Sequence, residues 1–217
     1  MCARRLAEAG VRVAMIARTE RTLALAAAST GAAPIAADVT DADAVRALPD
    51  RLETALGDRV PDILVNAAGA FTLAPIAETS PESFDAQLAA NLRGPFLMIR
   101  AFLPGMLARG SGHIVTLGSV AGRQAFPMNG AYSASKYGVR GLHAVLDAEL
   151  KGTGVRSTLV EPAATDTALW DAIDRSRFPG LPERDAMLAP EHVADAILFA
   201  LTRPADLAVR EIFLERT

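Results

Sequence analysis

The chain has 217 residues, of which 51% are hydrophobic and 22% charged, and this composition suits one globular α/β domain rather than a disordered chain. Its 22 basic and 25 acidic residues give a net charge of -3 without a basic run, which argues against a nucleic-acid partner. The single cysteine, Cys2, excludes an internal disulfide and fits a reducing cytoplasm. The histidines show no metal-ligand spacing, and no apolar run reaches the roughly 18 residues of a membrane span. We therefore predict no metal and no membrane association.

Hydrophobic periodicity predicts helices and strands that alternate along the chain. The expected helices cover residues 2–9, 20–29, 41–56, 81–109, 131–151 and 190–202. The expected strands cover residues 11–17, 35–37, 62–66, 112–117, 155–160 and 207–214. Proline removes a backbone donor, so the helix over 81–109 should bend near Gly94 and Pro95. Strands separated by helices imply crossover connections, hence a mostly parallel sheet with helices on both faces.

In such sheets, ligands bind beyond the carboxyl ends of the strands. The residues that follow the predicted strands are therefore candidates for a binding site, namely Arg18, Asp38, Asn66 with Gly69, Ser119, and Pro162 with Thr165. All of them should line one edge of the sheet.

A phenol and an ammonium stand four residues apart, at Tyr132 and Lys136, in a stretch of small residues. On a helix the two side chains share a face. A phenol ionises near pH 10, and a cation about 4 Å away at an effective dielectric of about 20 would lower that pKa by up to about three units. Tyr132 would then exchange a proton near neutral pH. The alternative is an ordinary amphipathic helix with an exposed Tyr and Lys, because Y-x-x-x-K is common by chance.

Several motifs in this order resemble the short-chain dehydrogenase/reductase family. The matching residues are the N-A-G-like turn Asn66-Ala67-Ala68-Gly69, the helix-bending Asn91, Ser119 at 13 residues before Tyr132, the motif Tyr132 to Lys136, and the P-G-like segment Pro162 to Thr167. Ala163 departs from this pattern, since relatives usually have glycine there. The resemblance covers nearly the whole chain and implies a single Rossmann-like domain over residues 1–217.

The resemblance implies hydride transfer between a nicotinamide cofactor and a carbonyl or alcohol. Tyr132 would exchange the proton on the substrate oxygen, and Ser119 would hold that oxygen by a hydrogen bond. Lys136 would lower the pKa of the tyrosine and bind the nicotinamide ribose, while Asn91 would connect Lys136 to solvent through a water. The implied cofactor contacts are Arg18, Asp38, Val39, Asn66, Ala67, Gly69, Tyr132, Lys136, Pro162, Thr165 and Thr167.

Arg18 favours NADP(H) over NAD(H). NAD-preferring relatives carry an acidic residue at the end of the strand that corresponds to residues 11–17. This chain has Ala17 there, followed by Arg18, and a guanidinium suits a ribose 2′-phosphate. The alternative is a solvated surface arginine. Asp38 with Val39 resembles the adenine contact of the family, but an acid after a short strand is also a common helix N-cap.

The family normally begins with a strand and a glycine-rich turn, T-G-x-x-x-G-x-G, and this chain has neither. Met1 to Gly10 aligns with the first helix of the family, so the central strand and the amides that hold the pyrophosphate are expected to be missing. The neighbouring strands would then have unpaired edges or would close up. Two explanations stay open: a start placed too late in the sequence, or a truncated protein that has lost tight cofactor binding.

Three functions are compatible with the sequence: a carbonyl reductase or alcohol dehydrogenase, a lyase or isomerase on the same fold, and a non-catalytic binding or interaction protein. A hydrolase is not expected, because residues 118–122 do not form G-x-S-x-G.

The segment over 168–189 is expected to form a mobile lid above an apolar, uncharged substrate. Its apolar residues are Leu169, Trp170, Ile173, Phe178, Leu181 and Met187. The alternative is a surface loop that packs its own hydrophobic residues. The helices over 81–109 and 131–151 are apolar on more than one face, which predicts a homodimer or homotetramer.

Overall fold

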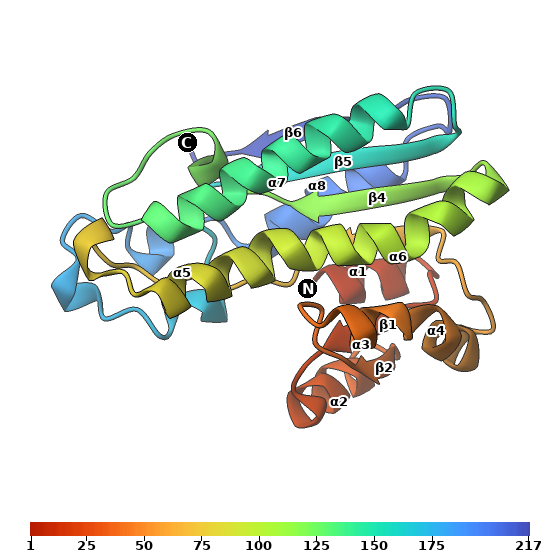
Figure 1. Cartoon of the computed structure of the whole chain (residues 1–217), viewed down its shortest axis with the longest axis horizontal. Coiled ribbons are helices and arrows are strands. Elements are labelled where there is room, and N and C mark those ends of the chain that lie inside the picture. The colour runs from red at the N-terminus through yellow and green to blue at the C-terminus, as the bar shows by residue number, and fades with distance from the viewer.

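The computed structural model describes all 217 residues, arranged in eight α-helices and six strands (Figure 1). The helices are α1 (Cys2–Glu8), α2 (Glu20–Ala28), α3 (Ala42–Arg46), α4 (Leu48–Leu56), α5 (Pro81–Leu88), α6 (Gly94–Arg109), α7 (Gly130–Glu149) and α8 (Pro190–Leu201). The strands are β1 (Ala14–Ala17), β2 (Ala33–Ala36), β3 (Ile63–Asn66), β4 (Gly112–Leu117), β5 (Val155–Pro162) and β6 (Glu211–Leu214). The predicted alternation of strands and helices is confirmed. No helix combines the length and the apolar composition that a membrane crossing requires.

The strands form two parallel sheets, whereas the sequence predicted one. One sheet has the order β1-β2 and the other the order β3-β4-β5-β6, and every strand pair is parallel. β1 pairs only with β2, and β3 pairs only with β4, so each has an edge whose backbone groups have no strand partner. These are the two strands for which unpaired edges were expected. They have not closed up on each other.

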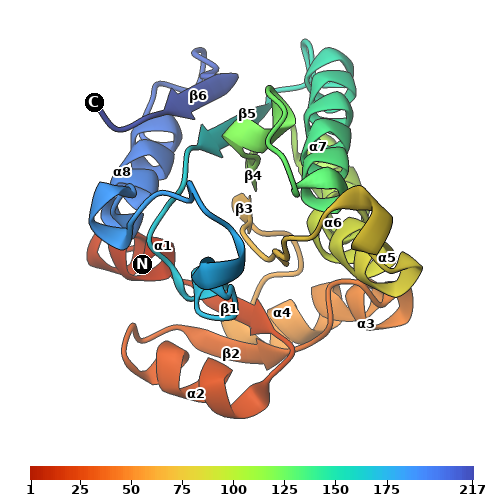
Figure 2. The same cartoon turned by 90° about the vertical axis from the view of Figure 1, so that its left-hand side faces the viewer.

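One apolar core joins the two sheets. Its buried side chains include Ile35 of β2, Leu64 of β3 and Ile114 of β4, together with residues of α3, α4, α6 and α7. Figure 2 shows α6 and α7 on one side of the four-stranded sheet and α1 and α8 on the other, with β1 and β2 below. A smaller cluster, which includes Val160 and Ile197, packs α8 against the sheet. This shared core packs the two sheets against the same helices and so fixes their relative positions.

Two expected helices are interrupted. The segment 41–56 divides at Ala47 into α3 and α4, because Pro49 has no N–H to continue the hydrogen-bond ladder. Asp41, rather than Asp38, caps α3 by accepting from the N–H groups of Asp43 and Ala44. The helix-cap alternative for Asp38 is therefore wrong. The segment 81–109 contains a π-helical turn over Ala89–Arg93, immediately before the predicted bend at Gly94.

The buried His113 of β4 should make stability fall in acid. Its Nε2 lies 2.8 Å from the hydroxyl of Thr158, while its Nδ1 is buried without a hydrogen-bond partner. Burial, with a smaller contribution from Arg156, lowers the pKa of His113 from 6.5 to about 4. Because the folded-state pKa is the lower one, the neutral ring stabilises the fold above pH 6.5, and this contribution is lost as the pH falls toward 4.

Between pH 7.5 and pH 5, His113 is expected to reduce the free energy of unfolding by about 2 kcal/mol, as measured by urea denaturation. His113→Gln should flatten this dependence. The control is His192→Gln, because His192 is exposed and its removal should leave the slope unchanged. A wild-type slope that persists in His113→Gln would assign the effect to other groups.

Candidate active site

Ser119 lies in a tight turn after β4. Its Oγ accepts a hydrogen bond of 3.1 Å from the N–H of Ala121, and only 7% of the residue is exposed. The turn continues to Gly122, where a Cβ would come within 2.8 Å of the carbonyl oxygen of Lys136. Only glycine permits this approach. The close contact places Ser119 against the helix that carries the tyrosine and lysine.

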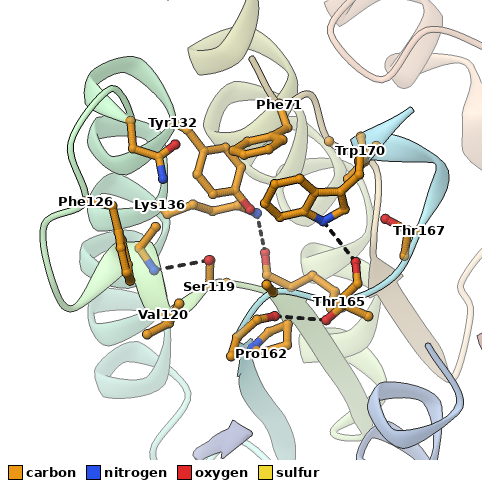
Figure 3. Close-up of a pocket in the computed structure, with 18 of the residues that line it drawn as sticks. Phe71, Ser119, Val120, Phe126, Tyr132, Lys136, Pro162, Thr165, Thr167 and Trp170 are labelled. Atoms are coloured by element: carbon orange, nitrogen blue, oxygen red, sulfur yellow. Dashed lines mark hydrogen bonds between the residues drawn. The ribbon is translucent and has the colours of Figure 1, made fainter. Parts of the chain in front are cut away.

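Tyr132 and Lys136 lie one turn apart on α7 and face the same cavity, as their spacing predicted (Figure 3). The Nζ of Lys136 donates a 2.8 Å hydrogen bond to the carbonyl of Leu117, at the end of β4. Nζ also lies 5.6 Å from the centroid of the Tyr132 ring. The alternative of an exposed pair on an ordinary helix is wrong, because Lys136 is only 6% exposed.

The electrostatics differ from the expectation in one respect. Burial raises the pKa of Tyr132 above 10, and a hydrogen bond with Ser119 offsets this only in part. Burial also lowers the pKa of Lys136 from 10.5 to about 8. The predicted net lowering of the phenol pKa is therefore wrong for this structure, because the desolvation of the buried phenol outweighs the effects that favour the phenolate. Tyr132 is protonated at neutral pH.

Asn91 is fully enclosed in the π-helical turn between α5 and α6. Its Oδ1 accepts from the N–H of Ala70, and its Nδ2 donates to the carbonyl of Ala70, both at 2.8 Å. Nδ2 also lies 3.0 Å from the Oγ of Ser135, the residue before Lys136. A Cβ on Gly69 would lie 2.8 Å from Oδ1 of Asn91, so a larger residue there would displace the Asn91 amide. Asn91 thus joins the turn after β3 to the helix of Tyr132.

The segment after β5 lies on the opposite side of the cavity. The hydroxyl of Thr165 donates to the carbonyl of Ala163 at 2.9 Å, and the indole N–H of Trp170 donates to the carbonyl of Thr165 at 3.1 Å. Arg184 donates to the carbonyl of Thr167 at 3.0 Å and forms an ion pair with Asp166. These contacts hold the expected cofactor residues of this segment in place.

Arg18 and Asp38 meet at the ends of β1 and β2, where a 3.9 Å ion pair joins them. Burial opposes the ionisation of Asp38, but hydrogen bonds from Thr40 and the charge of Arg18 outweigh it and lower the pKa of Asp38. The side chain of Arg18 is 75% exposed and remains accessible to a ligand. Val39 instead packs against the apolar core, beside Gly94.

One cavity of about 690 Å³ brings most of the candidate residues together. Those that line it are Ala67, Gly69, Asn91, Ser119, Tyr132, Lys136, Pro162, Thr165 and Thr167. Arg18, Asp38, Val39 and Asn66 do not line it. The amide of Asn66 is buried and donates to the hydroxyl of Thr116 at 3.3 Å.

Phe71 and Phe126 also line this cavity, although neither was predicted as a site residue from the sequence. The ring of Phe71 packs edge-on against the ring of Tyr132, with a centroid distance of 4.8 Å. Its position two residues after Gly69, close to a predicted strand end, was the available signal.

The family model for short chain dehydrogenases matches residues 1–177 of this chain, which is more than half of its length. The chain belongs to the short-chain dehydrogenase family. It is 39% identical over 184 residues to D-threitol dehydrogenase of Mycolicibacterium smegmatis, which covers 80% of this chain and 70% of that protein. It is 36% identical over 219 residues to glycine betaine reductase of Emericella nidulans, which covers 97% of this chain but 17% of that longer protein.

Solved structures of related proteins agree with this family assignment. The closed form of serine dehydrogenase complexed with NADP+ has a TM-score of 0.85 at 28% identity, and the alignment covers 98% of this chain and 88% of that one. This short-chain dehydrogenase is thus an NAD(P)-dependent oxidoreductase with a Rossmann-like α/β fold.

The residues of the cavity fit the nicotinamide end of such a cofactor. Lys136 has three N–H donors, and the hydrogen bond to Leu117 uses one of them. Two donors remain for ribose hydroxyls, while Thr165 and Thr167 offer polar groups across the cavity. Arg18, at the end of β1, has the charge and the exposure that a 2′-phosphate needs.

Proposed function

We propose that this short-chain dehydrogenase interconverts a carbonyl compound and the corresponding alcohol, with Tyr132 as general acid and base. The observation that carries this proposal is the shared cavity of Ser119, Tyr132 and Lys136, with Thr165 and Thr167 opposite. A bound nicotinamide supplies or accepts the hydride. The protein itself donates the proton, orients the substrate and excludes water from the cavity.

In the reductive direction, Tyr132 donates its phenolic proton to the carbonyl oxygen as negative charge develops there. The raised pKa of Tyr132 keeps that proton in place at neutral pH. Ser119, buried beside the phenol, holds the same oxygen by a hydrogen bond. Lys136 is predominantly charged at pH 7, with a pKa of about 8, and its positive charge stabilises the tyrosinate that the proton transfer leaves. Asn91 supports this arrangement by connecting Ser135 to the turn at Ala70.

The decisive experiment is a panel of ketones and alcohols with NADPH and NADH, followed at the absorbance of the reduced nicotinamide. Consumption of NADPH on addition of a ketone supports the proposal. A product without net consumption would instead indicate a lyase or isomerase. Absence of both cofactor binding and turnover would favour a non-catalytic interaction protein.

NADP(H) is the proposed cofactor, and Arg18 is the residue that selects it. Arg18→Ala is expected to raise the KM for NADPH by about 10- to 100-fold, the effect of one lost hydrogen bond to a charged group, and to change the KM for NADH little. Arg21→Ala is the matched control, because Arg21 is exposed on the neighbouring helix α2. Equal changes in both KM values would mean that Arg18 does not contact the 2′-phosphate.

Three wider properties belong to the same proposal. Residues 168–189 act as the substrate lid, a role supported by Leu169, Trp170 and Leu181 of this segment, which line the cavity. The enzyme forms a homodimer or homotetramer through α5, α6 and α7, where Phe96, Tyr137 and Val145 are exposed. A monomeric mass by light scattering at micromolar concentration would contradict this assembly.

A cytoplasmic location agrees with the single free cysteine.

A further inference from the structure

The charged side chains around the cavity limit the substrate. Only Lys136 and Glu215 among the lining residues carry a formal charge. Lys136 is already engaged with Leu117 and is assigned to the cofactor in the proposed function. A carboxylate or phosphate on the substrate would therefore have no cation of its own in this cavity. Burial of an unpaired charge is costly, so the cavity favours a neutral compound.

An aromatic wall, formed by Phe71 and Trp170, flanks the proposed proton donor. The ring centroids of Phe71 and Tyr132 are 4.8 Å apart, and those of Phe71 and Trp170 are 5.0 Å apart. Both pairs are edge-to-face, with interplanar angles of 73° and 64°. Figure 3 shows Phe71 and Trp170 on the same side of Tyr132, with Phe126 across the cavity from Trp170. A group attached to the reacting carbon would lie against this wall.

Contacts with neighbouring residues fix the position of Trp170 in the aromatic wall. The indole N–H of Trp170 is occupied by the carbonyl of Thr165 at 3.1 Å, so its ring presents only apolar carbon and π surface. Arg184 bridges Asp166 and Asp171, which flank the turn Ala168–Trp170 on both sides. Such aromatic surfaces accept another ring in offset or edge-to-face contact more favourably than a polyol chain.

We propose that the aromatic wall of Phe71 and Trp170 selects neutral carbonyl compounds with an aromatic ring attached to the carbonyl carbon, that is, aryl ketones, and their alcohols. This inference rests on the proposed function and narrows it to a substrate class. The ring packs against Phe71 and Trp170 while the carbonyl oxygen meets Tyr132 and Ser119. Polyols and keto acids lack one of the two required properties, an aromatic ring and neutrality.

The test compares kcat/KM with NADPH for acetophenone, cyclohexyl methyl ketone, dihydroxyacetone and phenylglyoxylate. Acetophenone isolates the ring, its cyclohexyl analogue supplies equal bulk without π electrons, and phenylglyoxylate adds a carboxylate. We expect acetophenone to be the best of the four. Trp170→Ala and Phe71→Leu should each lower kcat/KM for acetophenone by about 10- to 200-fold and lower it much less for dihydroxyacetone. Trp170→Phe should retain most of the preference.

Phe199→Leu is the matched control, because Phe199 is 50% exposed on α8 and does not line the cavity. Binding can be followed without turnover, since Trp170 is the only tryptophan of the chain. Acetophenone should change its fluorescence in the presence of NADP+, and Phe71→Leu should weaken that response.

A preference for dihydroxyacetone, for phenylglyoxylate or for the cyclohexyl ketone would overturn the aryl selection while leaving the proposed oxidoreductase function intact. Unchanged discrimination in both Trp170→Ala and Phe71→Leu would also overturn it. If no carbonyl compound or alcohol supports cofactor turnover, the proposed function itself fails, and the substrate inference fails with it.

Discussion

Tyr132→Phe is expected to lower kcat by about 10²- to 10⁴-fold, the usual contribution of a positioned acid or base. Phenylalanine retains the ring that packs on Phe71 but removes the only proton that the chain would donate to the substrate oxygen. The dissociation constant for NADPH should change little, because the phenol is not needed to bind the phosphates. Steady-state kinetics and fluorescence titration with NADPH measure the two quantities.

The second tyrosine of the chain provides the matched control. Tyr137 lies on the same helix but is 48% exposed, outside the cavity. Tyr137→Phe should therefore have wild-type kcat. A Tyr132→Phe enzyme with more than a tenth of wild-type kcat would rule out the phenol as the proton donor. An equal loss in both variants would point to a folding defect instead.

Substitution of Glu161 is expected to be the most destabilising change at a single charged residue. Glu161 of β5 is fully buried, and its Oε2 lies 2.5 Å from Nε of Arg123 and 3.8 Å from Nη1 of Arg140. Arg123 and Arg140 are also paired with Glu211 of β6, and together these carboxylates hold the pKa of Arg123 above its ordinary value, against the opposing effect of burial. This group of four charges joins β5, β6, α7 and the turn that carries Ser119.

Glu161→Gln removes one partner of the buried pair and leaves the other in place, which typically costs about 3 to 5 kcal/mol of unfolding free energy. We expect a loss of about 3 kcal/mol, because Arg123 keeps Glu211 and is partly exposed. Urea denaturation at neutral pH measures the loss. Asp43→Asn is the control, since the pair between Asp43 and Arg46 is exposed and should contribute less than about 1 kcal/mol.

A double-mutant cycle with Arg123→Met tests whether the loss comes from the pair itself. The double variant Glu161→Met with Arg123→Met should lose less unfolding free energy than the sum of the losses in the single variants Glu161→Met and Arg123→Met. Additive losses would show that Glu161 acts through packing alone. Its Cγ lies 2.8 Å from the position that a Cβ on Gly118 would occupy, so a packing contribution is expected beside the charge.

Much of the fold could be predicted because it depends on local patterns. The bounds of β4, Gly112–Leu117, agree with the prediction, since a β-branched apolar run between two glycines is a strong local signal. The break at Ala47 was predictable only from Pro49, a signal that the helical pattern of residues 41–56 concealed. The division into two sheets is a matter of pairing between distant segments, which periodicity does not report.

The candidate site likewise combines features that the sequence predicts with contacts that it does not predict. Tyr132 and Lys136 could be paired from their spacing alone, because four residues make one helical turn. The hydrogen bond of Lys136 to Leu117 joins residues 19 positions apart, and the contact of Glu161 with Arg123 joins residues 38 positions apart. Neither contact leaves a pattern in one sequence. The contacts of Phe71 with Tyr132 and Trp170 connect three separate segments of the chain in the same way.

The order of strands and helices could be predicted from the sequence, together with the family and its motif residues Asn91, Ser119, Tyr132 and Lys136. Short-range spacing and hydrophobic period encode these features, and both are properties of neighbouring residues. The folded structure was needed to show that burial raises the pKa of Tyr132, that Lys136 binds the end of β4, and that Phe71 packs against the phenol ring. Desolvation and side-chain contacts depend on which distant segments pack together, and that information exists only once the chain has folded.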